Sequence, residues 1–198
     1  MLTACVIHGV GFHKDLSHVN KFAATLTSRT GINTIVWPWD HPGTFPVDPR
    51  KTGSLFRSIR SFTWEVIMDF AYSFKEYDRH VAETPKADIY IGHSAGGVLA
   101  MANENCPCAL MGCPVELVRR LTGVQGFGLR GGACGVLNIM QERDPIAAPF
   151  LGADNRIVKS RSWFDIINPV AAHTSYWESK QVIDLVSAWM KLIAEELE

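Results

Sequence analysis

The amino-acid sequence predicts an α/β fold, in which a mostly parallel sheet of about six strands carries helices on both faces. Short apolar runs of strand length alternate along the chain with segments whose apolar residues recur at helical spacing. The chain has 198 residues, 47% of them hydrophobic, which is enough to bury the core of one domain. We therefore expect a single domain over residues 1–198, with ligand sites at the carboxyl ends of the strands.

Six runs are predicted to be strands because each is short, is largely apolar or β-branched, and is followed or preceded by turn residues. In chain order they are residues 3–7, 34–37, 89–91, 109–111, 136–140 and 156–159. The first run, Thr3 to Ile7, ends at the turn His8-Gly9-Val10-Gly11. Such a start is typical of a first core strand and differs from a signal peptide, which would begin with a positive segment.

The segments between these runs supply the predicted helices. Apolar residues recur at helical spacing in residues 16–26, 64–77 and 182–193, and a shorter helix is expected at 98–101. Gly31 is expected to end the first helix. Residues 38–53 are rich in Pro, Gly and Asp and indicate a loop, and the glycines of 123–135 lack the spacing and terminal lysine of a phosphate-binding loop.

The segment Gly92-His93-Ser94-Ala95-Gly96 has the G-x-S-x-G pattern of a nucleophile elbow. It follows the predicted strand at residues 89–91 and opens a run that can be helical. In such an elbow the serine occupies a sharp turn between strand and helix, and the glycines let the two elements pack closely. Ser94 is therefore the candidate nucleophile, provided that the chain supplies a base and an acid to activate it.

His173 is the candidate general base. It is the only one of the seven histidines that follows Ser94, and an elbow enzyme carries its catalytic residues in the order serine, acid, histidine. Ser175 and Glu178 have capping-box spacing, which predicts that His173 lies in the loop just before the final helix. A structural loop histidine is the alternative interpretation.

The acid is expected between Ser94 and His173 in the sequence. The candidates are Glu104, Glu116, Glu142, Asp144, Asp154 and Asp165. We select Asp144, because it follows a buried strand in a turn-like segment and can orient the imidazole and stabilise the imidazolium. Asp165 is the main alternative acid, and Glu142 is the third candidate. The alternative for Asp144 itself is a solvated turn aspartate with no catalytic role.

Acyl transfer also needs hydrogen-bond donors for the oxyanion that develops in the transition state. The backbone N–H of Ala95, directly after the nucleophile, is one predicted donor. The second is expected in the loop after the first strand, and we select the N–H of Val10. A tight strand-to-helix turn with no catalytic role is the alternative for this loop.

Together these motifs resemble the α/β-hydrolases, and in particular their small serine esterases and lipase-like members. The resemblance rests on His8-Gly9-Val10-Gly11, on Gly92-His93-Ser94-Ala95-Gly96, on the turn Arg143-Asp144-Pro145 and on His173 before the last helix. Met111-Gly112-Cys113-Pro114 is also similar to the strand and G-x-P turn that often follow the nucleophile helix in lipase-like members. The family implies Ser94 as nucleophile, His173 as base and Asp144 as acid, and it implies no metal or organic cofactor.

The chain also departs from the family pattern. It is short and has only about six candidate strands, so we expect neither the early antiparallel strands nor a large cap domain. Substrate restriction then falls to loops, and residues 38–60 are expected to flank the mouth of the site. The oxyanion loop reads H-G-V-G, whereas one esterase branch has H-G-G-G.

The expected activity is hydrolysis of a small-molecule carboxylic ester through an acyl intermediate on Ser94. An amidase, a thioesterase or an acyltransferase with the same triad is an alternative, because the triad activates the nucleophile and does not select the acyl acceptor. A non-catalytic binding module on a hydrolase scaffold is the alternative from a different class.

Charge and cysteine content bound the partners and the compartment. Nineteen Lys and Arg stand against 20 Asp and Glu, so no overall charge favours nucleic acid or anionic lipid, and no apolar run reaches transmembrane length. The five cysteines lack the spacing of a disulfide framework, which indicates a cytoplasmic protein. Cys106, Cys108 and Cys113 weakly suggest a zinc cluster, but ordinary thiols are the favoured interpretation.

Overall fold

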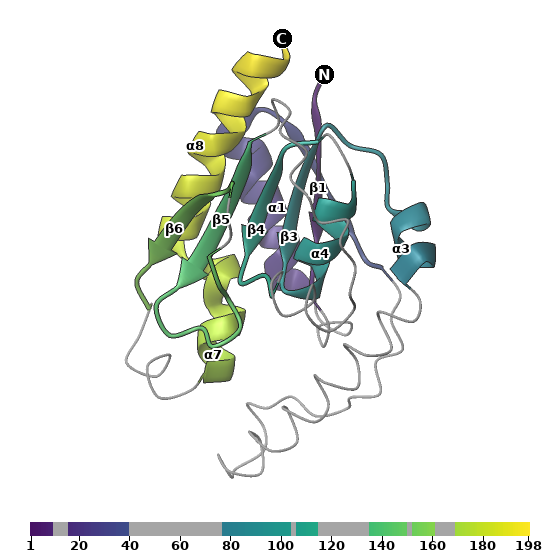
Figure 1. The fold of residues 1–198 in the computed structure, drawn as a ribbon. Helices are drawn as coiled ribbons and strands as arrows, with labels where there is room; N and C mark the ends of the chain where they lie inside the picture. The colour runs from purple at the N-terminus through teal and green to yellow at the C-terminus, as the bar shows by residue number, and fades with distance from the viewer. Residues whose placement is uncertain (10–15, 40–76, 104–105, 115–134, 150–151, 161–168) are drawn as a thin grey trace.

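The computed structural model of the protein describes residues 1–9, 16–39, 77–103, 106–114, 135–149, 152–160 and 169–198 (Figure 1). The predicted loop at 38–53 and the predicted glycine-rich connection at 123–135 lie almost entirely outside the described residues, as does the predicted helix at 64–77. Val10, proposed as an oxyanion donor, also lies outside them, and so does Asp165, the main alternative acid.

Six strands form one sheet in the described part of the chain, in the order β2-β1-β3-β4-β5-β6. They are β1 (Thr3–Ile7), β2 (Asn33–Trp37), β3 (Ile89–His93), β4 (Cys108–Met111), β5 (Val136–Gln141) and β6 (Asp154–Val158). Each neighbouring pair runs parallel. The predicted α/β class and strand number are thus confirmed, and β6 begins two residues before the predicted start at Arg156.

Helices cover both faces of this sheet, as the sequence predicts. The elements are α1 (Ser17–Thr30), α3 (Tyr77–Glu83), α4 (Ala95–Ala102), α7 (Pro169–Thr174), the 3₁₀ helix η1 (Ser175–Glu178) and α8 (Lys180–Leu197). Helices α1 and α8 pack against each other on one face, and α3 and α4 lie on the other (Figure 1). Gly31 ends α1 in a left-handed conformation, with φ 76° and its N–H donating to the carbonyl of Thr27.

The alternation of side chains along each strand divides the core into two clusters. In β1, Ala4 and Val6 join the cluster under α1 and α8, whereas Cys5 and Ile7 join the cluster under α4. Both sets are fully buried. Strands buried on both faces are typical of a parallel sheet between two helical layers, and they hold the ends of the strands in fixed positions.

The carboxyl ends of the central strands place the polar candidates at one edge of the sheet. His8 follows β1, Ser94 follows β3, Gly112 follows β4, and Asp144 comes three residues after the end of β5. In open parallel sheets, ligands bind beyond this edge. These strand ends bring together residues that are up to 136 positions apart in the sequence, between His8 and Asp144.

Candidate active site

Ser94 lies on a strained turn between β3 and α4. Its φ of 53° and ψ of −126° make it the one described non-glycine residue with a positive φ. The turn is held because the Ser94 N–H donates to the carbonyl of Met111 at 3.0 Å. A side chain at Gly9 would place its Cβ 2.7 Å from the Ser94 Cβ, so glycine there lets the loop after β1 approach the serine. Backbone strain of this kind is concentrated at functional sites.

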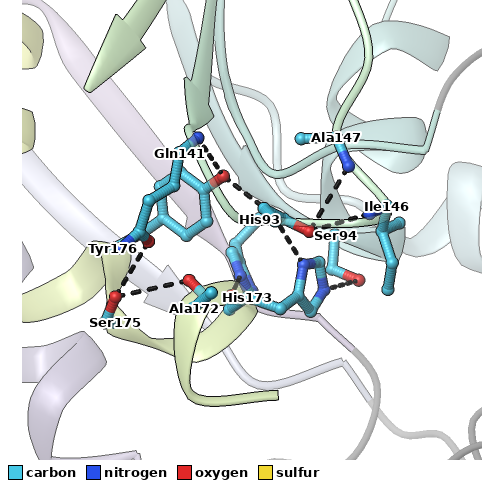
Figure 2. Close-up of polar contacts among 10 residues, drawn as sticks. His93, Ser94, Gln141, Ile146, Ala147, Ala172, His173, Ser175 and Tyr176 are labelled. Carbon is cyan, nitrogen blue, oxygen red and sulfur yellow. Dashed lines mark hydrogen bonds and ion pairs between the residues drawn. The ribbon is translucent and has the colours of Figure 1, made fainter. Parts of the chain in front are cut away.

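His173 connects the serine to a carboxylate (Figure 2). Its Nε2 lies 2.9 Å from Ser94 Oγ, and its Nδ1 lies 2.9 Å from Asp144 Oδ2. An ionised carboxylate only accepts hydrogen bonds, so Nδ1 carries the ring proton and donates it. Nε2 is then free to accept the hydroxyl proton of Ser94, which is the arrangement that general-base activation requires.

Asp144 is held as a buried anion. Burial on its own would raise the pKa of this carboxyl, but the charge and the hydrogen bond of His173, together with further hydrogen bonds, lower the pKa below its ordinary value. Its Oδ1 accepts from the N–H groups of Ile146 at 2.9 Å and Ala147 at 3.4 Å. The carboxylate is consequently negative at neutral pH and oriented by the chain that follows it.

The local structure around His173 differs from the prediction. His173 lies inside α7 rather than in a loop, and the final helix begins at Lys180 with Ser179, not Ser175, as its N-cap. The Ser179 side chain accepts from the N–H of Val182 at 3.4 Å. The predicted capping box is wrong because the Ser175 hydroxyl donates to Gln141 Oε1 at 2.9 Å instead of capping the final helix. Ser175 is the first residue of η1.

The structure places the remaining predicted residues as follows. Glu142 is exposed, and Asp154 pairs with Arg156 at 2.8 Å on β6, so neither carboxylate joins the Ser94–His173 pair. Glu104 and Glu116 lie outside the described residues, whereas Ala95 is the first residue of α4, directly after Ser94.

Within the described ranges, no group of three or more His, Cys, Asp or Glu side chains could hold a metal ion. In the same part of the chain, Cys106, Cys108 and Cys113 form no disulfide. Among the helices that the structure describes, none is long and apolar enough to cross a membrane.

Three further residues complete the site and were not assigned a role from the sequence. Gly112 has φ 57°, and a Cβ there would lie 2.7 Å from Asp144 Oδ2 and 3.2 Å from His173 Cε1. Tyr176 donates its hydroxyl proton to Asp144 Oδ2 at 2.8 Å. His93, the variable residue of the elbow motif, lies with its ring 4.9 Å from that of His173. Of these three residues, only Gly112 belonged to a motif noted in the sequence, the G-x-P turn.

His93 is a fully buried, neutral histidine. Its Nε2–H donates to the backbone carbonyl of His173 at 2.7 Å and so ties α7 to the strand that carries the serine. Burial, followed by the neighbouring His173, lowers the pKa of His93 from 6.5 to about 3. Protonation of His93 is therefore linked to unfolding.

The free energy of unfolding should fall with decreasing pH because of His93. Below pH 6.5 the unfolded chain takes up a proton at this position, whereas the folded protein takes up none until the pH reaches about 3. The loss across this window is on the order of 5 kcal/mol for a shift of this size. Urea unfolding at a series of pH values should show a shallower dependence for His93→Gln, which keeps a donor but does not titrate.

Equal slopes for the wild type and His93→Gln would contradict the assignment of a buried neutral imidazole.

The sheet order, the strained elbow after β3 and the histidine that joins serine to carboxylate define the α/β-hydrolase fold, as the sequence motifs predicted. No protein-family model matches the chain, and no curated protein matches it.

Solved structures with a similar fold include three hydrolases. An esterase domain from Rhodothermus marinus is 15% identical, with a TM-score of 0.46 over 96% of this chain and 86% of that one. A dienelactone hydrolase from Anabaena variabilis is 16% identical, with a TM-score of 0.47 over 96% and 85%. A carboxyl esterase from Tuber melanosporum is 13% identical, with a TM-score of 0.49 over 96% and 78%. These similarities concern the fold alone.

Proposed function

We propose that the protein is a serine hydrolase that cleaves carboxylic esters through an acyl intermediate on Ser94. The observation that carries the proposal is the continuous hydrogen-bonded series from Ser94 Oγ through both nitrogens of His173 to Asp144 Oδ2. Each member has the chemical state that its role needs: a hydroxyl 2.9 Å from the base, a base whose Nε2 can accept the hydroxyl proton, and an ionised acid.

In the first half of the proposed cycle, Ser94 Oγ attacks the ester carbonyl while His173 Nε2 takes the hydroxyl proton. The imidazolium that forms is stabilised by the Asp144 carboxylate. Negative charge develops on the carbonyl oxygen, and the N–H of Ala95 at the start of α4 is a donor for it. His173 then protonates the leaving alcohol, which leaves the acyl group on Ser94.

In the second half, His173 takes a proton from water, and the resulting hydroxide attacks the acyl carbonyl. Collapse of the tetrahedral intermediate releases the carboxylic acid and returns the proton to Ser94. Every proton and electron pair comes from side chains, substrate or water, so the proposed cycle has no cofactor. We further propose that residues 1–198 form one domain, since α8, near the carboxyl end, packs on α1, near the amino end. The proposed substrate is a small-molecule ester.

The test is turnover of uncharged esters of graded acyl length, beside the matched amides and thioesters. We expect ester hydrolysis with a burst of alcohol release, because acylation and deacylation are separate steps. A mass increase equal to the acyl group should map to the peptide that contains Ser94. Turnover of amides or thioesters in the absence of ester turnover would overturn the ester assignment while keeping the triad, and turnover of none of them would overturn the proposal.

A further inference from the structure

Tyr176 is buried beside the triad and uses its hydroxyl in two directions (Figure 2). The hydroxyl oxygen accepts from the N–H of Gln141, the last residue of β5, at 2.8 Å. The hydroxyl proton is donated to Asp144 Oδ2, also at 2.8 Å. Tyr176 therefore fixes the carboxylate relative to the end of β5.

The same carboxylate oxygen receives a second donor. His173 Nδ1 lies 2.9 Å from Asp144 Oδ2, so imidazole and phenol share one oxygen. Tyr176 lies only three residues after His173, in η1 directly beyond α7. One short segment of the chain therefore carries both donors. Two donors on one oxygen share its negative charge, and a stronger bond to one weakens the bond to the other.

We propose that Tyr176 is a positioning residue that both orients Asp144 and limits the strength of the Asp144–His173 hydrogen bond. The inference rests on the proposed function, because it concerns how strongly the acid stabilises the protonated base during catalysis. Without the phenol, Asp144 would concentrate its charge on His173 and favour the imidazolium. With the phenol, the imidazole stays available as a base at lower pH.

The surroundings keep Tyr176 in the donor state. Burial, followed by the negative charge of Asp144, raises the pKa of the phenol well above its ordinary value. Among the described residues, the titratable groups that face the carboxylate are His173 from α7, Tyr176 from η1 and His93 from β3. Since His93 is neutral above about pH 3, the balance at Asp144 lies between the phenol and the imidazole.

The first variant pair is Tyr176→Phe with Tyr90→Phe as its matched control. Tyr90 is also a buried residue, and its partly buried hydroxyl makes two hydrogen bonds, accepting from the N–H of Ala87 and donating to the carbonyl of Pro85, both at 3.0 Å. Tyr90 is the second residue of β3, whereas Ser94 and the site follow the other end of this strand. Each variant thus removes one hydroxyl and leaves one backbone N–H without its acceptor, and only Tyr176→Phe changes the carboxylate.

Two readouts separate positioning from mere stability. In Tyr176→Phe, the acid limb of the kcat/KM profile should move to higher pH by roughly half a unit or more, because a single lost hydrogen bond to a charged group has an effect of this order. The low-field proton NMR signal of His173 Nδ1–H should move further downfield. Tyr90→Phe should change neither readout. An unchanged limb and signal in folded Tyr176→Phe, or equal changes in both variants, would overturn the proposal.

If Tyr176→Phe does not fold, replacement of Tyr176 by 3-fluorotyrosine keeps the proposal testable. The fluorinated phenol is a stronger donor, so both readouts should move in the opposite direction, and a shift in the same direction as Tyr176→Phe, or no shift, would overturn the proposal. The NMR signal does not depend on turnover. If the wild type hydrolyses no substrate, the proposed function fails, and the NMR arm still decides whether Tyr176 shares the carboxylate.

Discussion

Ser94→Ala is expected to lower kcat for ester hydrolysis by roughly 10⁴-fold or more, because loss of the nucleophile removes the covalent pathway as a whole. The fold should persist. Alanine keeps the Cβ of serine, so the backbone strain at φ 53° is unchanged, and the hydroxyl removed has its described bond to His173 alone. Steady-state kinetics, together with the melting temperature and a circular dichroism spectrum, would measure both parts of this expectation.

Ser187→Ala is the matched control for this variant. Ser187 is also a buried serine, but it lies on α8 within the helical layer. Its removal should leave kcat and KM at wild-type values. Ester turnover by Ser94→Ala at the wild-type rate would contradict the proposed mechanism, because another group would then have to attack the carbonyl.

Gly112→Ala is expected to damage both stability and activity. At φ 57° an alanine is strained, at a cost of about 1 kcal/mol or more. Its Cβ would also lie 2.7 Å from Asp144 Oδ2 and 2.9 Å from Tyr176 Cε2, so the carboxylate must move. Displacement of a catalytic group by about 1 Å costs on the order of 100-fold in rate, and we expect a loss of this size in kcat/KM.

Gly31→Ala separates strain from collision. Gly31 also has a positive φ, 76°, but no atom lies within 4 Å of the position its Cβ would take. It should lose about 1 kcal/mol of unfolding free energy and keep full activity. Comparison of the two variants by urea unfolding and kinetics tests the packing around the triad. Wild-type kcat/KM in folded Gly112→Ala would mean that the carboxylate does not need its described position.

The sequence predicted the architecture well because each strand and the flanking helices carry a strong local signal. The Thr3–Ile7 run and the glycine after the first helix appear at their predicted places. The order of serine, acid and histidine along the chain selected three residues that the structure joins through hydrogen bonds of His173 to Ser94 and to Asp144. Their catalytic roles are a proposal that kinetics must test.

The parts that sequence reasoning missed depend on contacts between distant segments. Ser175 has the spacing of a helix cap, but its hydroxyl bonds to Gln141, 34 residues away, and the helix cap falls on Ser179. His93 bonds to the carbonyl of a residue 80 positions later. Tyr176 meets Asp144 across 32 positions. No local pattern encodes such pairings, because they arise only when the strands meet at one edge of the sheet.

The most direct test of the central claim is the reaction of the folded protein with a fluorophosphonate probe, followed by peptide mass spectrometry. Such a probe labels a serine only when a neighbouring base activates it, and no substrate needs to be assumed. Our account predicts one adduct, confined to Ser94, which is lost in Ser94→Ala and strongly slowed in His173→Gln. A folded wild-type protein that forms no adduct, or forms it on another residue, would contradict the claim that Ser94, His173 and Asp144 are a catalytic triad.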